Sequence, residues 1–510
     1  MSVVFASDLV PVREVPAPDF HKPYPLVLDF DGTLLRTDLL LEAALDYVKR
    51  RPIGIFMLLL WALRGVAHLK HQLASRTELA VSLLPINDEL VTYARLAAEG
   101  GREVIAATAA NRVIAEKVRA RFGFVSEVLA SCDRVNLKGP LKAEALMQRF
   151  PDGYAYAGDA GSDLAVWRHA RFGVFAGRDP ALLDRLCRVT ALEAAFIPPR
   201  AQLKDWLRAM RLHQWAKNGL LFIPLLLAGQ LLDPSKVFAC IAAFVAMGLV
   251  ASATYILNDL LDLEADRQHW SKRKRPFAAG VIGIPQAIAA STLLLTLGFG
   301  LAAVAAGPAV LGLLGLYCAV TLGYSLHLKR TPILDVTVLA ALFTLRLVLG
   351  AAAVEVRISA WLLVFSMFLF LSLALAKRST EIERKFAADA LENGNKARGY
   401  VATDVAGSGR GYIAADAPII AGFGVSSALA AVQVMVLYLI NDAFSDTLYG
   451  FPQLLWVAPV VIGLWLGRVW LLCGRGILND DPVVFAVSDK VSLALGGCVL
   501  ASFIGAAVIA

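Results

Sequence analysis

ACIAAFVAMGLVASATYILNDLLDLEADRQHWSKRKRP, residues 239–276, joins an apolar segment to a strongly charged one. The residues up to Leu257 carry no charge, and a segment of this length is sufficient to cross a bilayer. Three aspartates follow within nine residues, and five cations lie just behind them. A membrane helix that ends in this way predicts either a polar site at the membrane surface or a solvated loop.

The spacing of the three aspartates favours a metal site. If the helix continues, Asp259, Asp262 and Asp266 are offset by three, four and seven residues and lie on one face. Carboxylates on one stripe repel one another unless a cation joins them, and Mg²⁺ prefers such oxygen ligands together with substrate phosphates. Arg273 and Arg275 could then bind the same polyphosphate. The alternative is that these acids and bases merely solvate a loop.

The composition divides the chain into a soluble part and a membrane part. Hydrophobic residues make up 58% of the 510 residues and the mean hydropathy is +0.62, more than a soluble surface tolerates. Most charges precede residue 215 or so, and long apolar stretches follow. We predict a tail (residues 1–23), an α/β domain (24–197), a linker (198–217) and an all-α membrane domain (218–510).

The net charge of +7 does not point to nucleic acid, because no basic stretch is interleaved with aromatic residues. Anionic lipid or a phosphorylated substrate is the predicted partner. The six cysteines are scattered without CxxC pairs and are interpreted as small core residues. No cleavable signal peptide is recognised at the start, so the N-terminal domain is expected in the cytoplasm.

The N-terminal domain has polar residues at the ends of its predicted strands. YPLVLDFDGTLLRTD, residues 24–38, is an apolar strand that ends in Asp29 and Asp31, which lie on the same side of the chain. Later strands deliver Thr108 and Asp159, and Lys142 opens a helix. Because sites in parallel α/β sheets form at the carboxyl ends of strands, these groups and Asp163 are expected to converge.

DxDGT, then Thr, Lys and GDxxxD in this order resemble the haloacid dehalogenase-like (HAD) phosphohydrolases over roughly residues 24–195. The resemblance implies a Rossmann-like fold, with Asp29 as nucleophile, Asp31 as acid/base, and Thr108 and Lys142 as phosphate ligands. It also implies Mg²⁺ bound by carboxylates, namely Asp29, Asp31, Asp159 and Asp163. A turn with no catalytic role is the alternative for DFDGT taken alone.

A helical insertion, about residues 38–90, occupies the place of the small cap that selects the substrate in such enzymes. It contains PIGIFMLLLWAL, Pro52–Leu63, which at about 1.5 Å per residue is too short to span a bilayer. One interpretation is a buried cap helix. The other is a helix that rests on the membrane or on the second domain.

The membrane domain is predicted to contain about nine transmembrane helices. They lie near residues 218–233, 237–257, 284–306, 308–325, 333–354, 358–376, 418–440, 454–473 and 491–509. Lysines and arginines concentrate after the second, fourth, sixth and eighth spans, so these connections are expected to be cytoplasmic. This predicts a multi-pass protein of a bacterial-type inner membrane, with its N-terminal domain in the cytoplasm and its C-terminus on the opposite side.

NDxxDxxxD after the second span is similar to the UbiA-type intramembrane transferases, over about residues 204–509. That resemblance implies aspartate-bound Mg²⁺ at Asp259, Asp262 and Asp266, which activates a diphosphate. Aromatic prenyltransferases of this type usually carry a second DxxxD motif. Here YSLHLKRTPILDVTVL, residues 324–339, has Asp335 but ends in Leu339.

Further motifs resemble the polyprenyl-phosphate phosphoribosyltransferase branch, to which decaprenyl-phosphate 5-phosphoribosyltransferases belong. They are RLHQWAKN (211–218), YSLHLK (324–329), TLRLVLGA (344–351) and LALAKRSTE (373–381). In that branch the substrates are phosphoribosyl pyrophosphate and a polyprenyl phosphate. Arg346 stands inside a predicted span, where an unpaired charge costs ~2.5–3.5 kcal/mol. The resemblance makes substrate ligands of Lys217, Asn258, Arg273, Arg275, Tyr324, Lys329, Asp335, Arg346, Lys377, Arg378 and Glu381.

The two resemblances together predict a bifunctional enzyme that transfers 5-phosphoribosyl to a polyprenyl phosphate and then removes the 5-phosphate. This would be a step toward polyprenyl-phosphoryl ribose or arabinose. One alternative is an aromatic prenyltransferase of the 4-hydroxybenzoate type fused to an independent phosphatase. Another is a transporter or scaffold, although charge in transporters tends to lie at mid-membrane. No oligomeric state is predicted.

Overall fold

The computed structural model describes residues 24–392, 411–443, 449–478, 485–486 and 488–508. Two compact units make up the chain. The first comprises Met1–Met210 and Ile256–Ala290, and the second comprises Arg211–Tyr255 and Ser291–Ala510. The segment that carries the three aspartates therefore belongs to the first unit, although its sequence lies between two apolar helices.

The first unit is built on a parallel six-stranded sheet. Its strand order is β3-β2-β1-β4-β5-β6, and every neighbouring pair is parallel. The strands are β1 (Leu26–Leu28), β2 (Val104–Asn111), β3 (Val128–Ser131), β4 (Ala155–Gly158), β5 (Phe172–Phe175) and β6 (Ala191–Ala195). The chain builds the sheet outward from β1 in one direction and then resumes at β4 on the other side. In such a doubly wound sheet, the point where the order reverses lies between β1 and β4.

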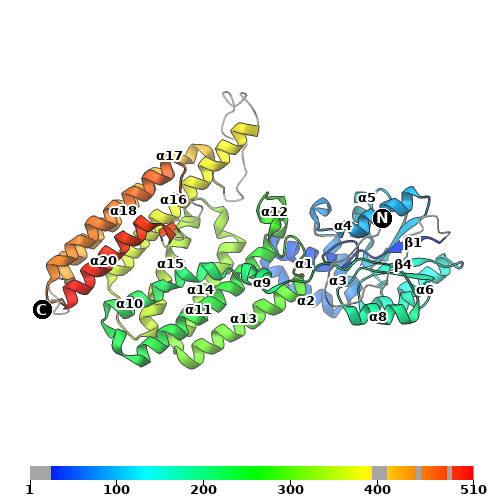
Figure 1. Ribbon diagram of the computed structural model, residues 1–510, viewed down its shortest axis with the longest axis horizontal. Helices are drawn as coiled ribbons and strands as arrows, with labels where there is room; N and C mark the ends of the chain where they lie inside the picture. Colours follow the sequence, from blue (N-terminus) through cyan, green and yellow to red (C-terminus); the bar gives the residue numbers. More distant parts are fainter. Residues whose placement is uncertain (1–23, 393–410, 444–448, 479–484, 487, 509–510) are drawn as a thin grey trace. The chain divides into compact units, whose positions relative to one another are not determined.

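Helices cover both faces of this sheet, because alternate strand residues point to opposite sides. Leu26 and Leu28 belong to one apolar cluster and Val27 to another. Figure 1 shows α4 and α5 on one side of β1 and β4, and α6 and α8 on the other. The α-helices of this unit up to residue 210, including those that do not cover the sheet, are α1 (Leu39–Arg50), α2 (Ile55–Leu63), α3 (Val66–Ala74), α4 (Asp88–Glu99), α5 (Arg112–Arg121), α6 (Pro140–Arg149), α7 (Leu164–Trp167), α8 (Pro180–Val189) and α9 (Leu203–Ala209).

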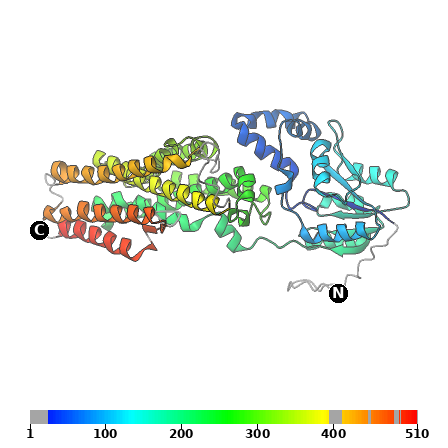
Figure 2. The same cartoon turned by 90° about the horizontal axis from the view of Figure 1, so that it is seen from above.

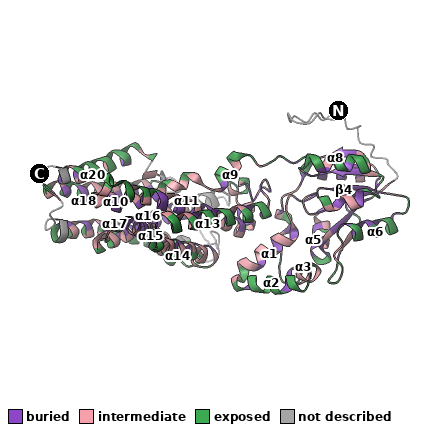
Figure 3. Ribbon diagram, turned by 90° about the horizontal axis from the view of Figure 1, so that it is seen from below, coloured by how far each residue is buried: buried purple, intermediate pink, exposed green. Residues whose placement is uncertain are grey.

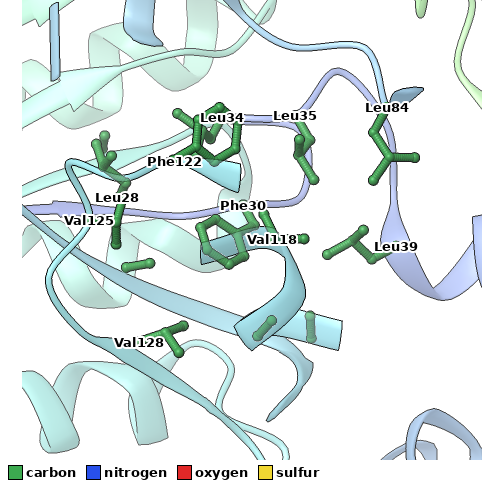
Figure 4. Packing of buried hydrophobic residues seen from close by; sticks show 14 of the residues in the cluster. Leu28, Phe30, Leu34, Leu35, Leu39, Leu84, Val118, Phe122, Val125 and Val128 are labelled. Atoms are coloured by element: carbon green, nitrogen blue, oxygen red, sulfur yellow. The ribbon is translucent and has the colours of Figure 1, made fainter. Parts of the chain in front are cut away.

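The residues after β1 anchor the first motif in the core. Phe30, Leu34 and Leu35 are fully buried, and Figure 4 shows Phe30 close to Val118 of α5. The polar residues of DFDGT are therefore fixed by apolar neighbours in the same loop.

The second unit is helical. Its elements, including those that extend into the first unit, are η4 (Leu212–Leu221), α10 (Phe222–Leu227), η5 (Gln230–Leu232), α11 (Pro234–Leu261), α13 (Ile284–Ala305), α14 (Pro308–Leu326), α15 (Leu334–Ala353), α16 (Ala360–Glu392), α17 (Ala417–Tyr438), η10 (Leu439–Ala443), η11 (Pro452–Trp456), α18 (Val457–Gly474) and α20 (Lys490–Val508). Figure 2 shows α16 and α17 running side by side.

Among the described residues, seven helices are long and apolar enough to cross a membrane, where the sequence predicted about nine. The predicted span at 218–233 is wrong. Its longest α-helix is α10, which has six residues, and Gly229 with φ +66° ends the helical path. The predicted span at 491–509 corresponds to α20, whose portion Lys490–Ala506 is apolar but too short to be counted among the seven. The chain is nonetheless a multi-pass membrane protein by the length and composition of its helices.

Candidate functional site

The candidate site of the sheet lies where the strand order reverses. Asp29 follows β1 and Asp159 follows β4, and these two strands pair directly. Both residues stand at the carboxyl ends of their strands, where parallel sheets bind ligands. The structure thus brings together the residues of two motifs that are 130 positions apart in the sequence.

A buried network surrounds Asp29. Lys142, 1% exposed, donates from Nζ to Asp29 Oδ2 at 2.7 Å and to the Tyr156 hydroxyl at 2.9 Å. The Tyr156 hydroxyl also lies 3.0 Å from Asp163 Oδ1 and 3.3 Å from Asp29 Oδ2. A cation and a hydroxyl thus hold two carboxylates in place. Tyr156 escaped the sequence analysis because a tyrosine in an apolar strand has the pattern of a core residue.

Asp159 and Asp163 are fixed by the turn after β4. Asp163 Oδ2 accepts hydrogen bonds from the backbone N–H groups of Asp159 at 3.1 Å and Ala160 at 3.0 Å. The Thr33 hydroxyl donates to Asp159 Oδ1 at 3.0 Å. Burial and the charge of Asp163 raise the pKa of Asp159 to about 7, and burial also raises the pKa of Asp163. Concentrated negative charge of this kind favours a bound cation.

Gly32 is required at its position for two reasons. Its φ is +74°, and a Cβ atom there would lie 2.2 Å from Asp159 Oδ2. The glycine of DxDGT therefore lets the β1 loop approach the β4 loop closely.

Asp31 faces the helical insertion. Its Oδ1 accepts a hydrogen bond from the N–H of Leu39 at 2.8 Å, at the start of α1. Burial and the charges of Asp38 and Asp29 raise the pKa of Asp31 to about 8. Burial of this kind favours the neutral form of the carboxyl group when no cation is near.

Lys70, on α3 of the helical insertion, borders the same region as Asp31. Its Nζ donates to the Ala109 carbonyl at 2.5 Å and to Asn136 Oδ1 at 2.9 Å, and burial lowers its pKa. A small cavity of about 10 Å³ lies beside Asp31 and is also lined by Lys70. Thr108 is fully buried in β2, and its Oγ1 accepts from the N–H of Ala110 at 3.1 Å.

In the acidic motif, two of the three aspartates share one cation. Nη1 of Arg275 donates to Asp259 Oδ1 at 3.0 Å and to Asp266 Oδ2 at 2.7 Å. The two carboxylate side chains are only 4% and 5% exposed. Burial raises the pKa of Asp266, against the opposing charge of Arg275.

The helix that carries the three aspartates is interrupted at Asp262. Helix α11 ends at Leu261, and α12 (Leu263–Gln268) begins after Asp262, whose φ of −102° and ψ of 12° interrupt the helix. The Asp262 N–H still bonds to the Asn258 carbonyl at 3.0 Å, so the chain turns little. Asp262 is partly buried and Arg273 is exposed. The structure thus joins Asp259, Asp266 and Arg275.

The segment with the acidic motif contacts the helical insertion within the first unit. Arg267 donates from Nη1 to Glu42 Oε2 at 3.1 Å and from Nη2 to Glu42 Oε1 at 2.6 Å. Arg178 donates to the carbonyls of Gly280 and Val281, each at 3.1 Å. Glu42 and Arg267 were not predicted as site residues, because a helix pattern does not indicate which surface charge will find a distant partner.

Arg346 is a buried cation of the second unit. Its guanidinium bonds to Asn218 Oδ1 at 3.1 Å, to the Leu342 carbonyl at 2.7 Å and to the Tyr317 hydroxyl at 3.2 Å. All three partners are neutral, and the residue is 4% exposed. Lys217 and Arg346 both lie over the aromatic ring of Phe343. Nζ of Lys217 is 5.6 Å from the centroid of Phe343, and the Arg346 guanidinium is 5.1 Å from it.

Arg378, by contrast, is held by carboxylates. It donates to Asp335 Oδ2 at 2.7 Å and also bonds to Glu381. The second oxygen of Asp335 accepts from the hydroxyl of Tyr412. Asp335 is fully buried and Arg378 is 2% exposed, so this group has the character of a structural ion pair. The remaining predicted ligands, Tyr324, Lys329 and Lys377, are partly buried.

Two sets of oxygen donors lie in the first unit, one at the ends of β1 and β4 and one in the acidic motif, and their chemistry suits a hard divalent cation. Among the described residues, no three acidic, histidine or cysteine side chains stand close enough together to surround an ion. Asp259 and Asp266 already converge on the Arg275 guanidinium, and the charges of Asp163 and Asp29 add to burial in raising the pKa of Asp159. The structure thus offers donors of the type that Mg²⁺ prefers, but within the described residues it does not gather three of them around one point.

Apolar helices long enough to cross a membrane, together with a parallel α/β sheet, define a multi-pass membrane protein that carries an α/β domain. The model of the UbiA prenyltransferase family matches residues 220–485, more than half of the chain. The chain belongs to the UbiA prenyltransferase family, whose members are membrane transferases.

Three relatives are similar to this chain. An uncharacterized protein of Sinorhizobium fredii, y4nM, is 37% identical over 489 residues, which cover 95% of this chain and 91% of the relative. The nodulation protein NoeC of Azorhizobium caulinodans is 34% identical over 300 residues, 58% of this chain and 90% of the relative. The decaprenyl-phosphate phosphoribosyltransferase of Corynebacterium glutamicum is 36% identical over 188 residues, 36% of this chain and 57% of the relative.

Proposed function

We propose that the chain is a bifunctional membrane enzyme. Its UbiA domain transfers 5-phosphoribosyl from phosphoribosyl pyrophosphate to a polyprenyl phosphate, and its N-terminal domain, a HAD-type phosphohydrolase, removes the 5-phosphate from the product. The lipid product would serve as a ribose or arabinose donor.

The observation that carries the first reaction is the state of Asp335. A second acidic motif would be needed to hold a prenyl diphosphate, but this carboxylate is fully buried and bound by Arg378 and Tyr412. Breaking that ion pair to bind a metal would leave a buried guanidinium without its partner, at a cost of ~3–5 kcal/mol. The geometry therefore favours one diphosphate site, at Asp259 and Asp266, and this supports a phosphorylated acceptor over an aromatic one.

The donor site would be formed by the acidic motif. Asp259 and Asp266 would hold Mg²⁺, which neutralises the pyrophosphate when bound. Arg275, now shared by the two carboxylates, is positioned to turn toward the pyrophosphate oxygens once a metal takes its place. Asp262 and Asn258 lie in the same turn and complete the set of oxygen ligands proposed there.

The acceptor phosphate would be bound by cations in the second unit. Arg346 has only neutral partners and Lys217 stacks on the same ring, so an incoming anion would offset a buried positive charge. A phosphate oxygen of the lipid forms a bond to C1 of the ribose, and the bond from C1 to the pyrophosphate oxygen breaks. Similarity to the phosphoribosyltransferase of Corynebacterium glutamicum supports this assignment.

The second reaction would take place at the edge of the sheet. A carboxylate oxygen of Asp29 would attack phosphorus, and Asp31, whose pKa is raised by burial, would give its proton to the departing 5-hydroxyl. Lys142 and Thr108 orient the phosphoryl group. Water then hydrolyses the aspartyl phosphate, with Asp31 as base. Asp159 and Asp163 would hold the Mg²⁺ that this chemistry uses.

An Asp29→Asn variant tests the coupling of the two reactions. Reconstituted with Mg²⁺, polyprenyl phosphate and ribose-labelled phosphoribosyl pyrophosphate, it should accumulate lipid-linked ribose 5-phosphate, whereas the native chain yields lipid-linked ribose. An identical product mixture from both proteins would show that the N-terminal domain acts on a different substrate.

A further inference from the structure

Helix α2 presents an apolar surface to solvent. The exposed side chains, called the α2 surface below, are Ile53, Ile55, Phe56, Leu59, Leu60 and Leu63. Ile53 is 81% exposed and Leu63 is 85% exposed, and Figure 3 shows the helix exposed along most of its length. The interpretation of this segment as a buried cap helix is therefore wrong. Exposed apolar side chains that are contiguous mark an interaction site.

The helix is nevertheless held firmly on its inner side. Trp61 is buried and stacks at 5.3 Å on Tyr47 of α1, while the Arg76 guanidinium lies 5.0 Å from its ring. Gly54 allows a close turn, since a Cβ there would meet the Tyr47 ring at 2.5 Å. The α2 surface is thus displayed by an ordered scaffold.

The charges around α2 indicate the kind of partner. Between Asp46 and Glu78 the chain has no acidic residue but six lysines and arginines: Lys49, Arg50, Arg51, Arg64, Lys70 and Arg76. Arg51 and Arg64 are exposed and flank the two ends of the apolar stretch. Cations at both ends of a short apolar helix suit lipid headgroups, whereas a contact buried against apolar helices would strip them of water.

The length of α2 specifies the mode of binding. Nine residues extend only about 14 Å, less than half the ~30 Å of the hydrocarbon core, so the helix cannot cross a bilayer. It can lie in the interface with its apolar side chains among the acyl chains. The same chain has seven described helices that are long and apolar enough to cross a membrane.

We propose that the α2 surface inserts into the headgroup region of a bilayer rich in anionic lipid. This membrane contact would hold the helical segment of about residues 38–90 at the membrane surface. Helix α1 begins beside Asp31, and α3 supplies Lys70 to the same cavity, so the helices on either side of α2 border the candidate phosphohydrolase site. Resting on the proposed function, this contact would give that site access to a phosphate carried on a lipid.

Photo-cross-linking of the full chain tests this proposal. A photoreactive benzophenone amino acid replaces Phe56 in one protein and, as a matched control, Leu141 of α6, which is also exposed but lies outside the α2 surface. Both are reconstituted in vesicles of phosphatidylcholine with phosphatidylglycerol, irradiated and analysed by mass spectrometry. We expect lipid adducts at position 56 to exceed those at position 141 by ~10-fold or more. Adducts to another segment of the chain or to a second copy, or no excess of lipid adducts, would overturn the proposal.

A charge substitution provides a second readout. Leu60→Glu should lower the yield of lipid adducts at position 56, and the matched variant Leu96→Glu, at an exposed leucine of α4, should not. Hydrolysis of p-nitrophenyl phosphate, which is soluble, should be equal in both variants, whereas hydrolysis of a lipid-linked sugar phosphate should fall only in Leu60→Glu. If lipid adducts form but neither substrate is hydrolysed, the proposed phosphatase function fails and the membrane contact stands.

Discussion

Arg267 and Glu42 form a buried, two-pronged ion pair between the acidic-motif segment and the first helix of the insertion. The side chains are 7% and 6% exposed, and Glu42 also accepts from the Thr37 hydroxyl at 2.6 Å. Since the two residues are 225 positions apart, this pair fixes a long-range contact within the first unit.

Removing Glu42 should therefore destabilise the first unit. Glu42→Gln leaves the Arg267 guanidinium buried without its counter-charge, and we expect a loss of ~3 kcal/mol or more in the free energy of unfolding. The control is Glu116→Ala, which breaks an exposed pair with Arg119 and should cost under ~1 kcal/mol. Thermal unfolding in detergent compares them, and equal midpoints for both variants would contradict the assignment.

Arg346 and Arg378 should behave in opposite ways. Arg346→Met removes a cation whose partners are neutral, so we expect transferase kcat/KM to fall by ~10²-fold or more with little change in thermal stability. Arg378→Met leaves Asp335 buried without its guanidinium, so its main effect should be on stability. Steady-state kinetics and thermal unfolding of both variants separate the two roles. A loss of thermal stability in Arg346→Met but not in Arg378→Met would contradict these two roles.

The metal dependence of the transfer reaction should reside in the acidic motif of Asp259 and not at Asp335. For Asp259→Asn we expect the Mg²⁺ concentration at half-maximal transfer to rise by more than ~10-fold, because even indirect changes around a metal alter affinity by ~10- to 100-fold. Asp335→Asn should leave that concentration unchanged, since Asp335 is bound by Arg378 and Tyr412. A Mg²⁺ titration of transfer activity measures both. Equal shifts would indicate a second metal site.

Gly32 should be essential for hydrolysis and dispensable for transfer. In Gly32→Ala, a methyl group would meet Asp159 and the backbone would keep an unfavourable φ of +74°. A displacement of about 1 Å at a reacting centre can cost ~10²-fold, and we expect phosphatase kcat to fall by at least that factor. Gly123→Ala, where a Cβ meets nothing within 4 Å, is the control. Full phosphatase activity in Gly32→Ala would refute the proposed site.

The sequence predicted the sheet well because its strands are short, apolar and punctuated by charged turns. Strand β1 and Asp29, and strand β4 and Asp159, could be placed from alternation and turn residues alone. Tyr156 could not, because its contact with Lys142 depends on a helix that packs from elsewhere in the chain. The sequence also singled out the acidic motif but did not indicate the break at Asp262 or the shared contact to Arg275.

Hydropathy alone overestimated the number of spans for a related reason. Residues 218–233 are apolar, but Gly229 takes a positive φ and the helical path there divides into short pieces. Helix α2 shows a second limit of hydropathy, because an apolar pattern does not reveal whether a helix is buried or exposed. Both outcomes are decided by packing with distant segments.

The transfer of ribose-linked label to lipid tests the central claim most directly. Purified protein in vesicles is incubated with Mg²⁺, polyprenyl phosphate and phosphoribosyl pyrophosphate labelled in the ribose, and the label is followed into the organic phase. We predict lipid-soluble label that disappears in Asp259→Asn and persists in Asp29→Asn as the 5-phosphorylated product. A lipid phase without label, together with prenylation of 4-hydroxybenzoate by the same protein, would contradict the account.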